Sequence, residues 1–142
     1  MSVEPVQVRF AMPDDLAFVG EGSGIAPEIM RRKIDEREVV VAERGGRLVG
    51  QARLEYLWSK IPYLALIRVR EGERRTGVGQ ALLAFVETFL QQQGHAALYS
   101  SSQVDEPAPQ AWHRHVGFVE CGSIAGINPG GIGEVFFRKP LS

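Results

Sequence analysis

The segment RRTGVGQALLAFV, residues 74–86, places two glycines at the start of an amphipathic helix, directly behind two arginines. Each interior glycine costs a helix roughly 1 kcal/mol relative to alanine. A helix N-terminus carries backbone N–H groups without intrahelical partners, and a glycine lets a bulky anion approach them closely. The sequence therefore predicts a phosphate-binding loop that leads from a strand into a helix over about residues 77–93. The apolar positions that can pack this helix on a sheet are Leu82, Leu83, Val86, Phe89 and Leu90.

Alternating apolar and polar residues predict strands on both sides of this helix, and a Gly-Gly pair predicts a tight hairpin. We expect strands at 6–11, 38–57 (two strands joined at Arg44, Gly45 and Gly46), 63–71, 96–102, 118–127 and 132–141. We expect further helices at 13–20, 27–37 and about 107–117. This order predicts an α+β (mixed α/β) domain spanning residues 1–142, with a central mixed sheet of six to seven strands and helices on both faces.

Composition excludes several classes of function. The net charge of -1 gives no basic bias toward nucleic acid, and no run reaches the ~18 apolar residues of a membrane helix. The first ten residues lack the charged and apolar regions of a signal peptide. The single cysteine, Cys121, favours a reducing compartment and a small buried side chain over a nucleophile or metal site. We therefore expect a cytoplasmic protein without a metal that binds neither nucleic acid nor a membrane.

Three phosphate-binding patterns can be compared with the glycine loop. The P-loop pattern is absent because no Lys-Ser/Thr pair follows either glycine, and the dinucleotide pattern fails because Leu82 stands where its third glycine belongs. The third pattern, a coenzyme A pyrophosphate loop of the form [R/Q]xxGx[G/A], is matched by Arg74, Gly77 and Gly79. Of the three patterns, the coenzyme A loop is the one that these residues match.

The chain resembles the GNAT family of N-acetyltransferases. The resemblance rests on VREGERRTGVGQALL (69–83) as strand, loop and helix, and on WHRHVGF (112–118) as a later helix ending in Gly-Phe, and it covers about residues 63–118. It implies that acetyl-CoA, as cosubstrate, lies between two splayed parallel strands, here 63–71 and 96–102. The residues that the resemblance assigns to acetyl-CoA are Ile67, Arg68 and Val69, whose backbone would pair with the pantetheine arm, and Arg74, Arg75, Thr76, Gly77, Val78, Gly79 and Gln80, which would hold the pyrophosphate.

The resemblance also suggests catalytic groups. Many family members carry a tyrosine as general acid four residues before the glycine of Gly-Phe, where this chain has His113. Histidine can donate a proton near neutral pH, but it can also simply pack in the core. For the general base we favour Glu134, which opens the last strand, over Glu55 and Glu71. Trp112 is expected in the core or in the acceptor pocket.

We therefore expect an acetyltransferase in which a primary amine, on a small molecule or a peptide, attacks acetyl-CoA directly. The backbone N–H of Ile67 would then polarise the thioester carbonyl. The alternatives are a non-catalytic acyl-CoA-binding regulatory module and a nucleotide-binding protein that uses the same loop. The resemblance also allows a homodimer. No segment of the sequence identifies the amine acceptor.

Overall fold

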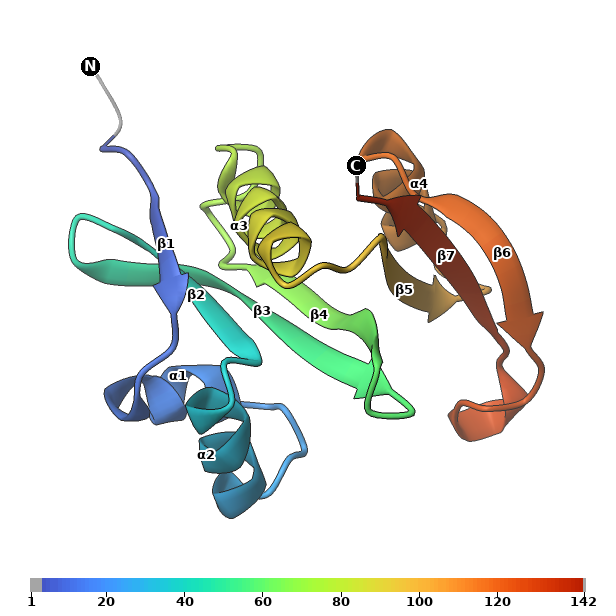
Figure 1. Cartoon of the computed structure of the whole chain (residues 1–142), viewed down its shortest axis with the longest axis horizontal. Helices are drawn as coiled ribbons and strands as arrows, with labels where there is room; N and C mark the ends of the chain where they lie inside the picture. The colour runs from blue at the N-terminus through green and yellow to red at the C-terminus, as the bar shows by residue number, and fades with distance from the viewer. Residues whose placement is uncertain (1–3, 142) are drawn as a thin grey trace. The chain divides into compact units, whose positions relative to one another are not determined.

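Seven strands pair into one mixed sheet in the order β1-β2-β3-β4-β5-β7-β6, in the computed structural model that describes residues 4–141 (Figure 1). The strands are β1 (Gln7–Phe10), β2 (Val39–Arg44), β3 (Arg47–Leu57), β4 (Ile61–Val69), β5 (Ala97–Gln103), β6 (Val119–Ile124) and β7 (Glu134–Pro140). The α-helices are α1 (Leu16–Gly20), α2 (Pro27–Asp35), α3 (Val78–Gln92) and α4 (Pro107–His115), with short 3-10 turns at Pro13–Asp15 and Pro129–Gly131. The predicted mixed fold is confirmed.

Two compact units make up the chain. The first unit comprises Met1–Leu54 and Leu66–Thr88, and the second comprises Glu55–Ala65 and Phe89–Ser142. β3, β4 and α3 each contribute residues to both units.

In the first unit, β2 lies in the middle of the core. All four residues from Val39 to Ala42 are buried, which explains why this strand is an unbroken apolar run rather than an alternating one. α1 and α2 cover one face of β1–β3, and the first turns of α3 cover the other (Figure 1). The core on the first face contains Ala11, Val19, Met30, Ile34, Val39 and Val41.

The predicted hairpin between β2 and β3 is confirmed. Arg44 and Arg47 are register partners, and Gly45 and Gly46 form the two-residue turn between them. Both glycines have positive φ, 59° and 76°, which is the conformation that a two-residue turn of this handedness requires.

The contact between β3 and α3 requires a glycine at position 50. A Cβ atom there would lie 2.9 Å from Cγ1 of Val78, 3.1 Å from the carbonyl oxygen of Arg68 and 3.2 Å from Cδ1 of Leu82. The missing side chain lets the first turn of α3 lie directly on β3.

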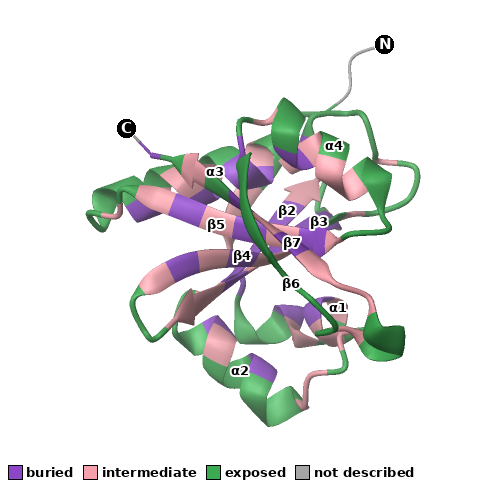
Figure 2. Ribbon diagram, turned by 90° about the vertical axis from the view of Figure 1, so that its right-hand side faces the viewer, coloured by how far each residue is buried: buried purple, intermediate pink, exposed green. Residues whose placement is uncertain are grey.

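The second unit combines parallel and antiparallel pairing. β4 and β5 are parallel, with Tyr63 opposite Tyr99 and Leu64 opposite Ser100, as the strand-helix-strand order predicts. β7 pairs with β5 and β6 in antiparallel fashion. Along β5 the buried positions alternate, whereas every residue of β6 is exposed (Figure 2).

Some local expectations were wrong. The segment at 13–20 is a 3-10 turn followed by the short α1 rather than one helix. On α2, Met30 and Ile34 are buried, whereas Ile29 has an exposed fraction of 42%. Cys121 was expected to be buried, but it lies on the exposed strand β6.

Replacing Gly50 by alanine should destabilise the protein by about 1–3 kcal/mol, because the stiff Val78 side chain and the Arg68 carbonyl leave no room for a Cβ atom. Denaturant unfolding measures this change. The control is Gly20→Ala, where the added Cβ meets nothing within 4 Å. Equal stability of the two variants would contradict the close contact.

Candidate functional site

The glycine loop connects β4 to α3 in the first unit. The backbone N–H of Arg70 donates to the carbonyl of Val49 at 2.8 Å, and that of Glu73 donates to the carbonyl of Arg70 at 2.9 Å. The chain then passes through positive φ at Arg75 (64°) and Gly77 (86°) before α3 begins at Val78. The predicted order of strand, loop and helix is confirmed.

The backbone N–H groups of residues 74–80 are open to a ligand. Within residues 4–141, no protein oxygen accepts a hydrogen bond from any of them, whereas the backbone N–H of Ala81 donates to the carbonyl of Gly77 at 3.0 Å. Unpaired N–H groups at the positive end of a helix attract an anion. Arg74 and Arg75 are exposed beside them and can add charge-assisted hydrogen bonds.

Different physical factors account for the glycines at positions 77 and 79. Gly77 has a positive φ, so any other residue would be strained there. Gly79 has no such conformation, and a Cβ atom added to it would meet only Cγ2 of Val69, at 3.8 Å. Packing within the protein therefore does not require a glycine at position 79. A bulky group bound at the N-terminus of α3 would require one. This absence of side chains at both positions fits a pyrophosphate.

A tether from β2 holds the loop in shape. The guanidinium of Arg44 donates to the Glu73 carboxylate at 2.7 Å, to the Thr76 hydroxyl at 3.1 Å and to the Thr76 carbonyl at 3.3 Å. The Thr76 hydroxyl in turn donates to the carbonyl of Glu73. Arg44 was predicted only as a hairpin residue, because nothing in its local sequence indicates a contact about thirty positions away.

The three residues predicted to contact pantetheine form the end of β4. Ile67 and Val69 are half-buried and Arg68 is exposed, all beyond the positions where β4 pairs with β5. Their place directly before the glycine loop is consistent with the predicted role.

His113 is buried in the second unit, with 5% of its surface exposed. Its Nδ1 lies 2.8 Å from the Pro109 carbonyl, and its Nε2 lies 2.8 Å from the Ser100 hydroxyl. The ring stacks on Phe137 of β7 at 4.8 Å between centroids. Burial lowers the pKa of His113 below its usual value, and Arg114 lowers it further, although the Pro109 carbonyl and Glu134 act in the opposite direction.

Glu134 belongs to a hydrogen-bonded chain that joins β4, β5 and β7. The Ser101 hydroxyl donates to Oε2 of Glu134 at 2.5 Å, so the Tyr63 hydroxyl, 2.5 Å from Ser101, is the donor in that contact. Nδ2 of Asn128 donates to Oε1 of Glu134 at 2.9 Å. The carboxylate is thus held at both oxygens.

Tyr63 stays protonated at neutral pH in this chain. Burial raises the pKa of its hydroxyl, and the negative charges of Glu134 and Glu55 raise it further, although the Ser101 hydrogen bond lowers it. Tyr63, Ser101 and Asn128 were not predicted as site residues. Their sequence signal is weak, because strand pairing brings them together from distant segments.

The remaining candidates from the sequence are Glu55, Glu71, Trp112 and Cys121. Glu55 is half-buried on β3, and Glu71 is exposed in the loop after β4. Trp112 is half-buried on α4 with its ring against His113. Partial desolvation raises the pKa of the Cys121 thiol, which disfavours the reactive thiolate.

Residues 4–141 lack two larger kinds of feature. They contain no group of three or more His, Cys, Asp or Glu side chains that could hold a metal ion. Within the same residues, no helix is both long and apolar enough to cross a membrane.

The sequence profile described as the Acetyltransferase (GNAT) family matches residues 11–118. No curated protein matches the sequence significantly. Solved structures with a similar fold include Ard1 from Thermoplasma volcanium, with 16% identity and a TM-score of 0.82 over 96% of this chain and 98% of that one. Ribosomal-protein-alanine N-acetyltransferase from Brucella melitensis has 23% identity and a TM-score of 0.79, over 95% and 99% of the two chains.

A third similar structure is that of yncA from Salmonella typhimurium with its cofactor acetyl-CoA. It has 15% identity and a TM-score of 0.81, over 97% of this chain and 95% of that one. Since the family profile covers most of the sequence, the chain belongs to the GNAT acetyltransferase family.

The low pKa of His113 predicts a pH-dependent stability. The folded protein disfavours the imidazolium, so the unfolded chain binds a proton more readily as the pH falls below about 6.5, and stability is lost from there downward. The free energy of unfolding should therefore be lower at about pH 5.5 than at about pH 7.5. His113→Phe should reduce this difference.

The exposed His115 provides the control, because His115→Gln should keep the pH dependence. A second loss is expected below about pH 4, because the hydrogen bond from Arg9 lowers the pKa of Asp15 in the folded protein and the unfolded chain therefore takes up this proton first. An unchanged pH dependence in His113→Phe would contradict the assignment.

Proposed function

We propose that this protein is an acetyl-CoA-dependent N-acetyltransferase in which a primary amine attacks the thioester directly, in a ternary complex. The neutral amine nitrogen forms a bond to the acetyl carbonyl carbon, the carbon–sulfur bond breaks, and coenzyme A leaves as the thiol. The amine loses one proton to a base on the protein, and the departing sulfur takes up one proton, from solvent or from His113. The observation that carries the proposal is the glycine loop, with its unpaired N–H groups and its two positions without side chains.

The residues present fit acetyl-CoA. The N–H groups of 74–80 and the guanidinium groups of Arg74 and Arg75 would hold the pyrophosphate, and the backbone of Ile67, Arg68 and Val69 would bind the pantetheine arm. The N–H of Ile67 would donate to the thioester oxygen and stabilise the charge that develops there. When bound, acetyl-CoA supplies an acetyl group that is already activated as a thioester.

Glu134 is the proposed general base. An alkyl ammonium has a pKa of ~10.4, so about one amine in a thousand is neutral at pH 7, and removal of its proton has to accompany attack. The Tyr63 hydroxyl donates toward Ser101, and Ser101 donates toward Glu134. Tyr63 can therefore accept a proton from the amine while it passes its own hydroxyl proton to Ser101. Ser101 in turn passes its hydroxyl proton to Glu134.

The role of His113 as general acid remains a prediction. Its ring nitrogens both contact protein oxygens, and its small exposed fraction supports a structural role as well. A thiol of pKa ~8.5 is a tolerable leaving group at pH 7, so direct attack can proceed without a strong acid.

We also propose that residues 1–142 act as one N-acetyltransferase domain. The similar acetyltransferase structures align with 95–97% of this chain, which supports this extent.

Acetyl-CoA and coenzyme A should raise the melting temperature of the protein, whereas NAD and ATP should not. At a ligand concentration a hundred times Kd the stabilisation is about 2.7 kcal/mol. The double variant Gly77→Asp, Gly79→Asp should lose this stabilisation, because two carboxylates would occupy and repel the pyrophosphate site. Thermal unfolding with each ligand measures both effects.

Gly126→Asp is the matched control, since Gly126 also has a positive φ (71°) and open space around it. It should keep the response to acetyl-CoA. Stabilisation by ATP or NAD equal to that by coenzyme A would instead indicate a nucleotide-binding protein. Stabilisation by acetyl-CoA without release of coenzyme A from any amine would favour the acyl-CoA-binding regulatory module.

Glu134→Gln should lower kcat about 10²–10⁴-fold, which is the usual contribution of a general base. Tyr63→Phe should lower it as well, because it breaks the proton path. Both deficits should shrink at high pH, where more of the amine is already neutral. The control is Glu71→Gln in the exposed loop, and a normal kcat in Glu134→Gln would exclude it as the base.

A further inference from the structure

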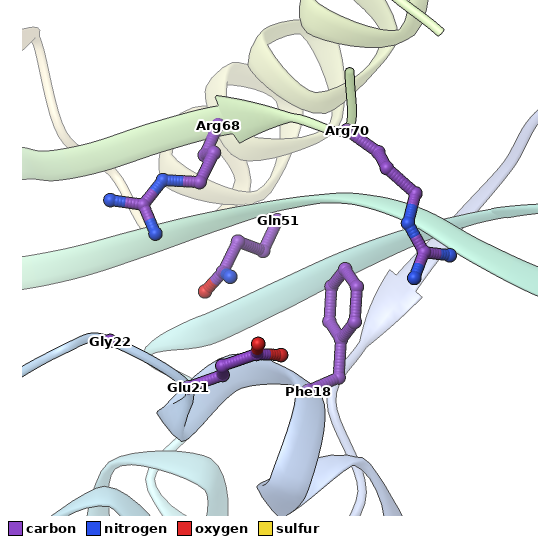
Figure 3. A pocket seen from close by; sticks show the side chains of 6 residues that line it. All are labelled: Phe18, Glu21, Gly22, Gln51, Arg68 and Arg70. Atoms are coloured by element: carbon purple, nitrogen blue, oxygen red, sulfur yellow. The ribbon is translucent and has the colours of Figure 1, made fainter. Parts of the chain in front are cut away.

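A cavity of about 380 Å³ lies in the first unit, and its side chains have no role in the function proposed above. The cavity is lined by Phe18, Glu21, Gly22, Gln51, Arg68 and Arg70 (Figure 3). Its size is suitable for a small molecule. The chemistry of its walls indicates which kind.

Gln51 provides an unsatisfied polar group in this cavity. Only 4% of its surface is exposed, and its Oε1 atom has no hydrogen-bond partner among residues 4–141. Figure 3 shows the amide pointing into the cavity, toward Glu21. Buried side-chain oxygens are nearly always paired, so an orphan acceptor in a cavity wall indicates a ligand that donates a hydrogen bond.

Two arginines from the end of β4 line opposite sides of the cavity and can each bind an anion (Figure 3). Arg68 is exposed, and no carboxylate within the described residues forms an ion pair with it. Nη1 of Arg70 donates to the Leu48 carbonyl at 3.1 Å, and Cζ of Arg70 lies 6.0 Å from the Phe18 ring centroid. Most of the five N–H donors of Arg70 are therefore available. Guanidinium groups bind carboxylates through paired hydrogen bonds.

We propose that this cavity binds the acetyl acceptor and that the acceptor is an aminocarboxylate, a small molecule with a primary amine and a free carboxylate. Arg68 would bind the carboxylate. Gln51 Oε1 and the Glu21 carboxylate, which has no ion-pair partner in the described chain, would accept hydrogen bonds from the amine. The inference rests on the proposed acetyltransferase function and adds the class of its acceptor.

The position of Arg68 connects the cavity with the reaction. Its backbone belongs to the strand segment proposed to bind the pantetheine arm, while its side chain lines the cavity. The acceptor would therefore bind beside the strand that holds the thioester. Polyamines are disfavoured because two guanidinium groups repel additional positive charge.

The test compares amino acids with their carboxamides and with spermidine as acceptors, by release of coenzyme A thiol. We expect kcat/KM at least about tenfold higher for an amino acid than for its carboxamide. Arg68→Gln should remove this preference by raising KM for the acid, with KM for acetyl-CoA unchanged. Arg47→Gln, at an exposed position outside the cavity, is the matched control.

Gln51→Leu distinguishes a binding role from a structural one. It should raise KM for amino acids while leaving the stability unchanged or higher, because it removes an unpaired buried oxygen. A loss of stability without a change in KM would overturn the role of Gln51.

Three results would overturn the inference: equal turnover of acids and carboxamides, a preference for spermidine, or weaker acetyl-CoA binding in Arg68→Gln. The first two leave the proposed acetyltransferase function intact. If no amine is acetylated, the proposed acetyltransferase function is wrong. Binding in the cavity is then tested by thermal unfolding with amino acids or their carboxamides in the presence of coenzyme A. Stabilisation by amino acids but not by their carboxamides would then support the binding site, and its absence would exclude it.

Discussion

The close contact at Gly50 determines where the rest of the first unit can lie. Because position 50 has no side chain, Val78 and Leu82 can rest on β3, and the carbonyl of Arg68 can lie beside them. This contact fixes the start of α3 relative to the end of β4. The orientation of the unpaired N–H groups, and of the Arg68 side chain in the cavity, follows from it.

Features encoded by neighbouring residues could be predicted from the sequence. The hairpin at Gly45 and Gly46, the long apolar face of α3 and the place of the glycine loop between strand and helix each depend on a few adjacent positions, and the structure confirms them. The strand-helix-strand order likewise predicts the parallel pair of β4 and β5. The ends of the helices and strands were predicted less accurately, because tertiary contacts rather than propensity decide where a strand begins.

Features that depend on pairing between distant segments could not be predicted. Glu134 was selected for its place before the last strand, but its link to Tyr63 exists only because β7 and β4 both flank β5. The orphan oxygen of Gln51 was equally hidden, since a glutamine within a strand carries no local signal of a cavity. A single sequence shows which side chains can perform chemistry, but the sheet order decides which of them meet.

The tether from Arg44 has a consequence for how a ligand would be received. Its guanidinium already fixes Glu73 and Thr76, so the loop is ordered in the free protein. The conformational entropy of the loop is thus lost during folding, and binding of an anion has less ordering left to oppose it. In this sense the loop is preorganised. The ion pair between Arg44 of β2 and Glu73 of the loop would adjust the affinity for an anion, although neither of these side chains has to contact the anion.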